Sequence, residues 1–199
     1  MAQKSIFIVL DGIDGSGTTT HSNLLKGFLE TKGFKVHLTQ EPSNSEIGIL
    51  IRKYLKNPSI PPITDALLFA ADRNLHYHRE IKEKLGQNYI VISDRYIESS
   101  IIYQSLQSDI MSIKWVKSIN KFVGLPDLTI ILDIDPKISL ARKTQQALEK
   151  FEDTSFLDEV RALYLKRAKK ENYFVLNSND IIEFVQNKIQ QIVLQKLKE

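Results

Sequence analysis

Hydrophobic residues gather in five short runs along the chain, and longer stretches of mixed polarity separate these runs. The runs occupy residues 6–10, 36–39, 89–93, 128–132 and 173–176. They are apolar without regular alternation, which is typical of strands that are buried on both faces of a sheet. The stretches between them have helical patterns and suit right-handed crossovers between parallel strands. The pattern predicts an α/β fold, a doubly wound five-stranded parallel sheet flanked by helices.

Three stretches between the predicted strands carry further information. About fifty residues separate the second and third runs, more than one crossover requires, and they read as at least two helices around the proline-rich residues 57–62. An insertion of this size usually carries function. Residues 142–153 are polar and charged and are interpreted either as a lid or as a solvated helix. Residues 160–170 are rich in Arg and Lys, and we expect them to form the water-facing side of a helix.

Composition and charge narrow the class of protein. With 199 residues, 42% of them hydrophobic and 26% charged, the chain is expected to form one globular domain over residues 1–199. The formal net charge of +3 gives no strong basic field, so we expect no nucleic-acid partner, although small anions can bind. The absence of cysteine excludes disulfides, thiol nucleophiles and cysteine-held metals. No apolar stretch approaches the roughly 18 residues of a membrane span, so we expect a cytoplasmic protein with no membrane partner.

A glycine-rich segment follows the first hydrophobic run and precedes a helical pattern that ends near Gly33. It matches the phosphate-loop pattern GxxxxGK[ST], in which backbone N–H groups converge on an anion at a helix N-terminus. One residue departs from the pattern, because Thr18 stands where the pattern has lysine. The segment predicts a P-loop NTPase fold with ATP bound by Gly12, Ile13, Asp14, Gly15, Ser16, Gly17, Thr18, Thr19 and Thr20. The alternative is a structural turn whose threonines cap the helix.

Candidate metal and catalytic residues follow two of the predicted strands. Thr19 has the hydroxyl position that coordinates Mg²⁺ in phosphate loops, and Asp94 and Arg95 directly follow the third run. Ligands of open α/β sheets bind at the carboxyl ends of strands. Asp94 is therefore expected to hold Mg²⁺ through water, and Arg95 to clamp phosphoryl oxygens with its planar fork. The alternative interpretation of this pair is a surface ion pair.

Further motifs are spread along nearly the whole chain. They are residues 11–17, Glu41-Pro42 with Ile47-Gly48 and Arg52, residues 67–73, Asp94-Arg95-Tyr96 with Ser99-Ser100 and Tyr103-Gln104, residues 132–136, and Lys150-Phe151-Glu152. In this combination the chain resembles the thymidylate kinases, members of the P-loop nucleoside-monophosphate kinase group. The resemblance implies transfer of the γ-phosphoryl of ATP to dTMP with Mg²⁺, and a homodimer. It also implies a monophosphate-binding insertion at about 41–88 and a lid at about 142–155.

The resemblance also implies which residues bind the acceptor. Phe69 and Arg73 are four residues apart on a predicted helix, so one can stack on a pyrimidine while the other donates to its carbonyl. Asp14 resembles the acidic residue that accepts from the sugar 3′-hydroxyl. The full implied set is Asp14, Glu41, Arg52, Phe69, Arg73, Arg95, Ser99, Ser100, Tyr103 and Gln104, with Arg52, Arg73 and Arg95 meeting the acceptor phosphate. The alternatives are Phe69 and Tyr103 as core residues, Arg73 as a surface residue, and Asp14 as a cap of the loop.

Because Thr18 replaces the lysine of the phosphate loop, the sequence is compatible with more than one function. Losing one preorganised contact costs on the order of 10²–10³ in kcat. Either another cation replaces the lysine, or the chain is a catalytically silent nucleotide-binding protein. The candidates for the cation are Arg95, Arg142, Lys143 and Lys150, and Arg142 is also expected to bind ATP. Within enzymes, the alternatives are kinases for another nucleoside monophosphate or for a deoxynucleoside.

Overall fold

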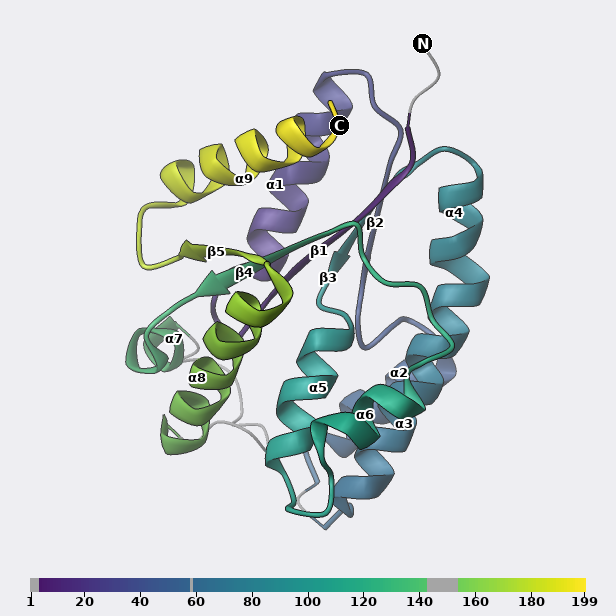
Figure 1. Ribbon diagram of the computed structural model, residues 1–199, viewed down its shortest axis with the longest axis vertical. Helices are drawn as coiled ribbons and strands as arrows, with labels where there is room; N and C mark the ends of the chain where they lie inside the picture. Colours follow the sequence, from purple (N-terminus) through teal and green to yellow (C-terminus); the bar gives the residue numbers. More distant parts are fainter. Residues whose placement is uncertain (1–3, 58, 143–153) are drawn as a thin grey trace.

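Five parallel strands form one sheet in the order β2-β3-β1-β4-β5 (Figure 1). The computed structural model describes residues 4–57, 59–142 and 154–199. The strands are β1 Ile6–Gly12, β2 Val36–Gln40, β3 Ile90–Asp94, β4 Leu128–Asp133 and β5 Phe174–Asn177. Leu10 of the central strand lies opposite Asp94 on one side and Ile130 on the other. The predicted doubly wound parallel sheet is therefore confirmed.

Alternate residues of β1 pack into different layers, as the period of two in a strand requires. Ile8 and Leu10 join Leu25 of α1 (Thr18–Thr31) and Ile189 of α9 (Ile182–Lys196) in one core cluster. On the other face, Val9 joins residues of α5 (Ile97–Leu106) and α6 (Ile113–Ile119). Helices thus cover both faces of the central strands, which explains why β1 and β3 are buried along their whole length, whereas the edge strand β5 is largely exposed.

The long interval between β2 and β3 folds into several helical elements, which confirms the expectation of at least two helices there. They are α2 Glu46–Tyr54, α3 Pro62–His76, the π-helical turn η1 Tyr77–Ile81, and α4 Lys82–Gly86. The last three follow one another without a break, so a single helical stretch runs from Pro62 to Gly86 and leads into β3. Within the three described ranges, no helix combines the length and apolar character needed to cross a membrane.

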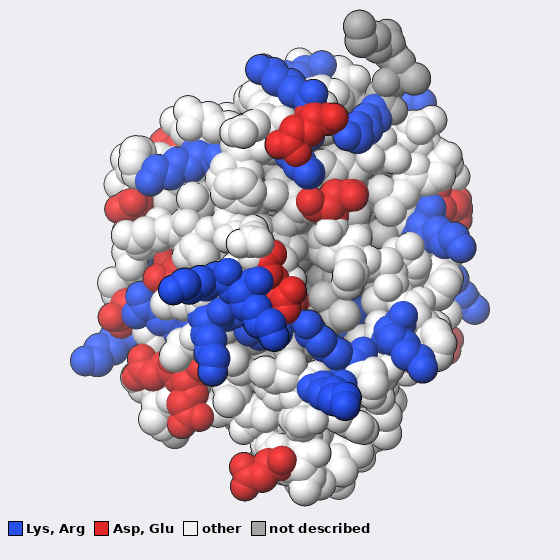
Figure 2. Space-filling model, in the orientation of Figure 1, with Lys and Arg blue, Asp and Glu red and all other residues white. Residues whose placement is uncertain are grey.

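The basic segment 160–170 lies in α8 (Thr154–Glu171) and differs in part from expectation. Lys166, Lys169 and Lys170 are exposed, and Figure 2 shows basic side chains gathered over this part of the surface. Arg167, however, is buried and donates from Nε and Nη2 to the carboxylate of Glu98 at 2.6 and 2.8 Å. A helical repeat of 3.6 residues places Arg167 on the inward side of α8, so the prediction of a purely water-facing segment is wrong.

Candidate functional site

The phosphate loop connects the end of β1 to the start of α1. Gly15 has φ +76, and a Cβ atom there would lie 2.8 Å from the carbonyl oxygen of Ser139, so only glycine fits. Gly17 is the N-cap of α1 in the left-handed conformation, and no side chain caps the helix. The alternative interpretation of the threonines as helix caps is therefore wrong. Because the first N–H groups of a helix have no intrahelical partner, this end of α1 suits an anion.

A cavity of about 530 Å³ opens beside this loop and is called the donor cavity here. It is lined by residues 14–21, Arg95, Arg142, Ser178, Asp180 and Ile182. Arg142, in α7 (Pro136–Arg142), donates to the carbonyls of Gly15 and Ser178 at 3.2 and 3.1 Å. The side chain of Ile13 is only 2% exposed and packs in the core, so a contact of Ile13 with ATP could come only from its backbone and stays a prediction. Gly12 also does not line the cavity, and its carbonyl accepts from Arg95 at 2.7 Å.

A second cavity of about 600 Å³, called the acceptor cavity here, lies between the sheet edge and the insertion. Every residue implied for acceptor binding lines it, together with Gln40, Pro42, Leu55, Tyr96 and Thr19. The two cavities share Asp14, Thr19 and Arg95. Two ligands occupying these cavities would therefore meet beside the same three side chains.

Arg95 lies at the junction of the two cavities. Its guanidinium pairs with the carboxylate of Asp14 and donates to Ser99 Oγ at 3.1 Å. Burial favours the neutral form of Arg95, but the charge of Asp14 and of other neighbouring groups outweighs it and raises the pKa well above the ordinary value. Arg95 thus stays cationic and does not pair with Asp94, so the alternative of a surface Asp94–Arg95 ion pair is wrong.

The oxygens of Thr19 and Asp94 form the candidate metal position. The Thr19 hydroxyl donates to Asp94 Oδ2, while Asp94 Oδ1 is buried and has no hydrogen-bond partner among the described residues. A buried carboxylate oxygen beside a hydroxyl fits a hard divalent cation. No group of three or more His, Asp or Glu side chains suited to a metal occurs in the described part of the chain. This sparse set suits Mg²⁺, which keeps waters and takes its remaining ligands from phosphates.

Arg73 and Phe69 occupy neighbouring turns of α3 on the acceptor side. Arg73 is only 1% exposed, and its Nε donates to Glu41 at 2.8 Å while Nη2 donates to Ser100 Oγ at 3.0 Å. The alternative that placed Arg73 at the surface is therefore wrong. Phe69 is half-buried and lines the cavity, so its ring is not a core residue.

Arg52 lines the acceptor cavity but is already engaged with the backbone. It donates to the carbonyls of Ser43 and Pro42 at 2.8 and 2.7 Å. Asp72 holds the same loop from the other side by accepting from the Ser43 amide and hydroxyl at 2.7 and 2.6 Å. The loop after β2 is thus shaped by Arg52, whose expected contact with the acceptor phosphate stays a prediction.

Asp11 is a buried residue at the end of β1 that supports the site without lining either cavity, and it is not among the predicted site residues. It accepts from the Ser99 hydroxyl at 2.6 Å and from the Tyr164 hydroxyl at 2.7 Å. Burial raises the pKa of Asp11, although Arg95 and these hydrogen bonds oppose the rise. These hydrogen bonds connect α5 and α8 to the end of β1, so Asp11 and Tyr164 help to position the loop that follows β1.

Ser178, Asp180 and His21 line the donor cavity, although the sequence motifs did not predict them. Ser178 and Asp180 follow β5, so the rule that ligands bind beyond the carboxyl ends of strands points to them. His21 lies one turn into α1, and its Nδ1 is 2.8 Å from Gln186 Oε1. Burial lowers the pKa of His21, which keeps the ring neutral. Lys143 and Lys150, considered as substitutes for the lysine, lie outside the described residues.

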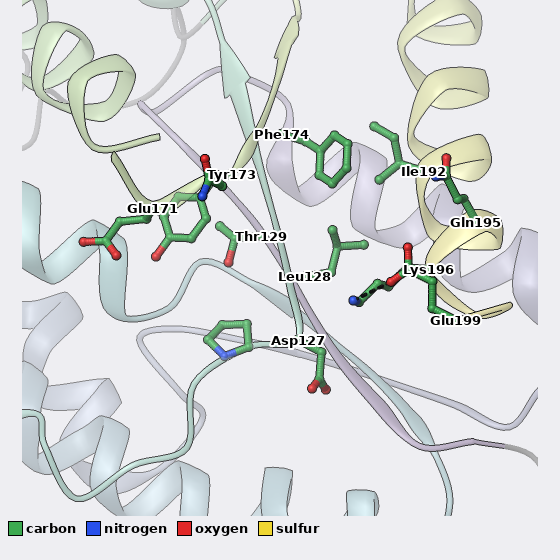
Figure 3. Close-up of a pocket in the computed structure, with 12 residues that line it drawn as sticks. Asp127, Leu128, Thr129, Glu171, Tyr173, Phe174, Ile192, Gln195, Lys196 and Glu199 are labelled. Atoms are coloured by element: carbon green, nitrogen blue, oxygen red, sulfur yellow. Dashed lines mark hydrogen bonds and ion pairs between the residues drawn. The ribbon is translucent and has the colours of Figure 1, made fainter. Parts of the chain in front are cut away.

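A third cavity lies at the opposite edge of the sheet (Figure 3). Its volume is about 280 Å³, and Leu128 and Phe174, the first residues of β4 and β5, line it with Ile192 and Lys196 of α9. Parallel sheets bind ligands beyond the carboxyl ends of their strands, whereas this cavity lies at the amino ends. The candidate active site is therefore the pair of cavities that share Arg95.

Comparison with known proteins decides the family. Residues 10–189 match the family model described as thymidylate kinase. The chain belongs to the thymidylate kinase family. It is 50% identical to a probable thymidylate kinase of Pyrobaculum aerophilum over 87% of this chain and 88% of the relative. Probable thymidylate kinases of Caldivirga maquilingensis and Staphylothermus marinus are 40% and 41% identical, over 97% and 98% of this chain and 95% and 97% of theirs.

Membership of the thymidylate kinase family confirms the resemblance found in the sequence. The match covers both cavities, because it runs from Leu10 in β1 to Ile189 in α9. The family assignment also agrees with the parallel sheet order and with the phosphate loop between β1 and α1. A member of this family is an ATP-dependent nucleoside-monophosphate kinase, which gives each cavity a class of ligand.

Proposed function

We propose that this protein transfers the γ-phosphoryl group of ATP to dTMP, giving dTDP and ADP. The observation that carries the proposal is the meeting of the donor and acceptor cavities at Asp14, Thr19 and Arg95. Phosphoryl transfer needs the attacking and leaving oxygens in line, and positioning accounts for most of its catalysis. Two ligand cavities with a common arginine at their junction supply this arrangement.

The chemical step is a direct transfer. An oxygen of the acceptor phosphate attacks the γ-phosphorus, the bond from that phosphorus to the β,γ-bridging oxygen breaks, and ADP leaves with the electron pair. A phosphate monoester is already anionic near neutral pH, so no general base is required. The start of α1 binds the donor phosphates through its N–H groups, and Arg95 neutralises charge between donor and acceptor.

Mg²⁺ is the cofactor that the site is proposed to hold. Thr19 and Asp94 would bind it, since their oxygens lie together and Asp94 Oδ1 has no hydrogen-bond partner in the described ranges. When bound, the ion neutralises negative charge on the donor phosphates. The chain's own contribution is to keep the hydroxyl of Thr19 and the carboxylate of Asp94 at the mouth of the loop.

The acceptor cavity favours a pyrimidine that carries an N3–H group. Phe69 offers a ring for stacking, and the side-chain oxygen of Gln104 is buried with no hydrogen-bond partner among the residues described. An unsatisfied buried acceptor disfavours a ligand that cannot donate to it. Thymine has the required N3–H donor, whereas cytosine has an acceptor at that position. This supports dTMP over dCMP.

The test is product formation by the purified protein with ATP, Mg²⁺ and each nucleoside monophosphate in turn. Formation of dTDP with a higher kcat/KM for dTMP than for dCMP or dGMP is the expected result. Faster phosphorylation of dCMP or dGMP would overturn the assignment of the base. Binding of ATP without any product would identify a silent nucleotide-binding protein. Activity on deoxynucleosides that survives Arg95→Ala would indicate a nucleoside kinase instead.

Other expectations accompany the proposal and stay predictions. They concern a cytoplasmic location, a homodimer, the absence of a nucleic-acid partner, an acceptor-binding insertion at about 41–88 and a lid at about 142–155. The acceptor cavity supports the role of the insertion, because Glu41, Arg52, Phe69 and Arg73 belong to that range and line the cavity. Most residues of the expected lid lie outside the described residues.

A further inference from the structure

His76, the last residue of α3, is a buried histidine that lines neither of the two cavities of the site. Its side chain has no exposed surface. The ring lies between two residues of the β2 region, with Nδ1 3.1 Å from Glu41 Oε1 and Nε2 2.7 Å from Thr39 Oγ1. Both ring nitrogens therefore have partners, and one of those partners belongs to the acceptor cavity.

Glu41 connects His76 to Arg73. The carboxylate of Glu41 divides its oxygens, because Oε1 faces His76 while Oε2 accepts from Arg73 Nε at 2.8 Å and lies 2.6 Å from Nη2. An ionised carboxylate can only accept hydrogen bonds, so Nδ1 of His76 carries a proton and donates it. The carboxylate is thus held at both oxygens, and its orientation is fixed.

Arg73 connects the fixed carboxylate of Glu41 to the wall of the acceptor cavity. Its Nη2 donates to Ser100 Oγ at 3.0 Å, and its Nη1 donates to Asn120 Oδ1 at 2.7 Å. Arg73 and Ser100 both line the acceptor cavity. A charged hydrogen-bonded chain therefore runs from a buried imidazole through one carboxylate to the surface that faces the acceptor.

We infer that His76 is a positioning residue for the acceptor nucleotide, acting through Glu41 on Arg73. Without the proton at Nδ1, Glu41 Oε1 loses its buried donor and the carboxylate can turn away from Arg73. Arg73 then loses the geometry in which it meets a pyrimidine monophosphate. The inference deepens the proposed function, since it takes the acceptor cavity to be the dTMP site.

The other side of the ring faces away from the acceptor. Nε2 of His76 meets Thr39 and lies 3.7 Å from Glu80 Oε2, and Glu80 Oε1 lies 2.7 Å from His37 Nε2. The hydrogen bond from His37 lowers the pKa of Glu80 to about 2, so Glu80 stays ionised. Because the two nitrogens serve different partners, variants that retain only one of them separate the positioning role from general packing.

The experiment compares His76→Asn with His76→Gln. The amide nitrogen of asparagine is three bonds from Cα, like Nδ1, whereas that of glutamine is four bonds away, like Nε2. We expect His76→Gln to raise KM for dTMP on the order of tenfold, the loss of one hydrogen bond to a charged group. His76→Asn should keep KM for dTMP within about twofold of the parent, and both variants should keep KM for ATP.

His78→Asn is the matched control, because His78 follows on the same helical stretch and is exposed. Its kinetic constants and thermal midpoint should equal those of the parent. An unchanged KM for dTMP in His76→Gln would overturn the inference, and so would equal losses in both His76 variants accompanied by a raised KM for ATP. A parent protein that fails to phosphorylate dTMP would instead overturn the proposed function, so the two failures are distinguishable.

Discussion

The donor and acceptor cavities differ in how far the protein alone completes them. On the acceptor side, Arg73 is 1% exposed and already bonds to Glu41, Asn120 and Ser100. On the donor side, Thr18 stands where the phosphate-loop pattern has a lysine, and no side chain caps α1. The acceptor side is therefore built from side-chain contacts within the protein, whereas on the donor side no side chain caps the first N–H groups of α1.

This difference indicates which groups must supply the binding energy for the donor and for the acceptor. A preorganised site loses little side-chain freedom when its ligand binds, so much of the interaction energy remains as affinity. The donor cavity has two arginines among its described lining residues, Arg95 and Arg142, and backbone N–H groups at the start of α1. The proposed binding of the donor thus rests on Mg²⁺, the loop backbone and these arginines, and each contribution can be removed separately.

The largest effect is expected from Arg95→Ala, which removes the one guanidinium that both cavities share. We expect kcat to fall on the order of 10³, or about 4 kcal/mol, because the lost charge acts on the transferring group. Steady-state kinetics with both substrates varied would measure the loss. Arg161→Ala is the control, since Arg161 pairs with Asp133 at the end of β4. A loss below tenfold in Arg95→Ala would contradict a shared role.

A smaller loss, about 10² in kcat, is expected from Asp94→Asn, which weakens the candidate metal position on the donor side. The concentration of Mg²⁺ that gives half-maximal activity should rise at the same time. A magnesium titration at saturating ATP and dTMP provides the measurement. Asp133→Asn serves as the comparison, because Asp133 also ends a strand but pairs with Arg161. An unchanged magnesium requirement in Asp94→Asn would remove Asp94 from the metal position.

Thr18→Lys tests whether the donor side is incomplete. Restoring a cation at the start of α1 should raise kcat on the order of tenfold, since a fixed positive charge stabilises the transferring phosphoryl group. Single-turnover measurements would separate this gain from faster product release. Thr18→Gln, which adds length without charge, is the control. No gain in kcat with lysine would mean that another cation already does this work.

The smallest effect is expected from Arg142→Ala. Arg142 donates to the Gly15 carbonyl of the loop and to the Ser178 carbonyl just after β5. Its loss should raise KM for ATP by about fivefold, within the range of one hydrogen bond to a charged group. KM for dTMP should not change, because Arg142 does not line the acceptor cavity. Lys137→Ala, an exposed change on the same helix, is the reference. An equal rise in both KM values would contradict the division into two sides.

Local patterns predicted the strands and much of the site. The hydrophobic runs predicted all five strands, most clearly β1, β3 and β4, which are buried in the sheet. The spacing of Phe69 and Arg73 predicted that they share a helical face. Contacts between residues far apart in the chain could not be predicted from any local sequence pattern. The hydroxyl of Tyr164 meets Asp11 across 153 positions of sequence, and His76 meets Glu41 across 35. Such pairs depend on tertiary packing, so only the structure shows them.

The backbone conformation of Arg95 limits insertions and deletions at the end of β3. Arg95 has φ 68, a left-handed conformation that costs a side-chain-bearing residue on the order of 1–3 kcal/mol. At this bend the side chains of two adjacent residues point to different partners. Asp94 contacts Thr19, and Arg95 contacts Asp14. One residue inserted between them would separate these two contacts, and deleting either residue would remove one contact. Evolutionary change at this corner is therefore confined to substitution, whereas surface loops elsewhere can also grow or shrink.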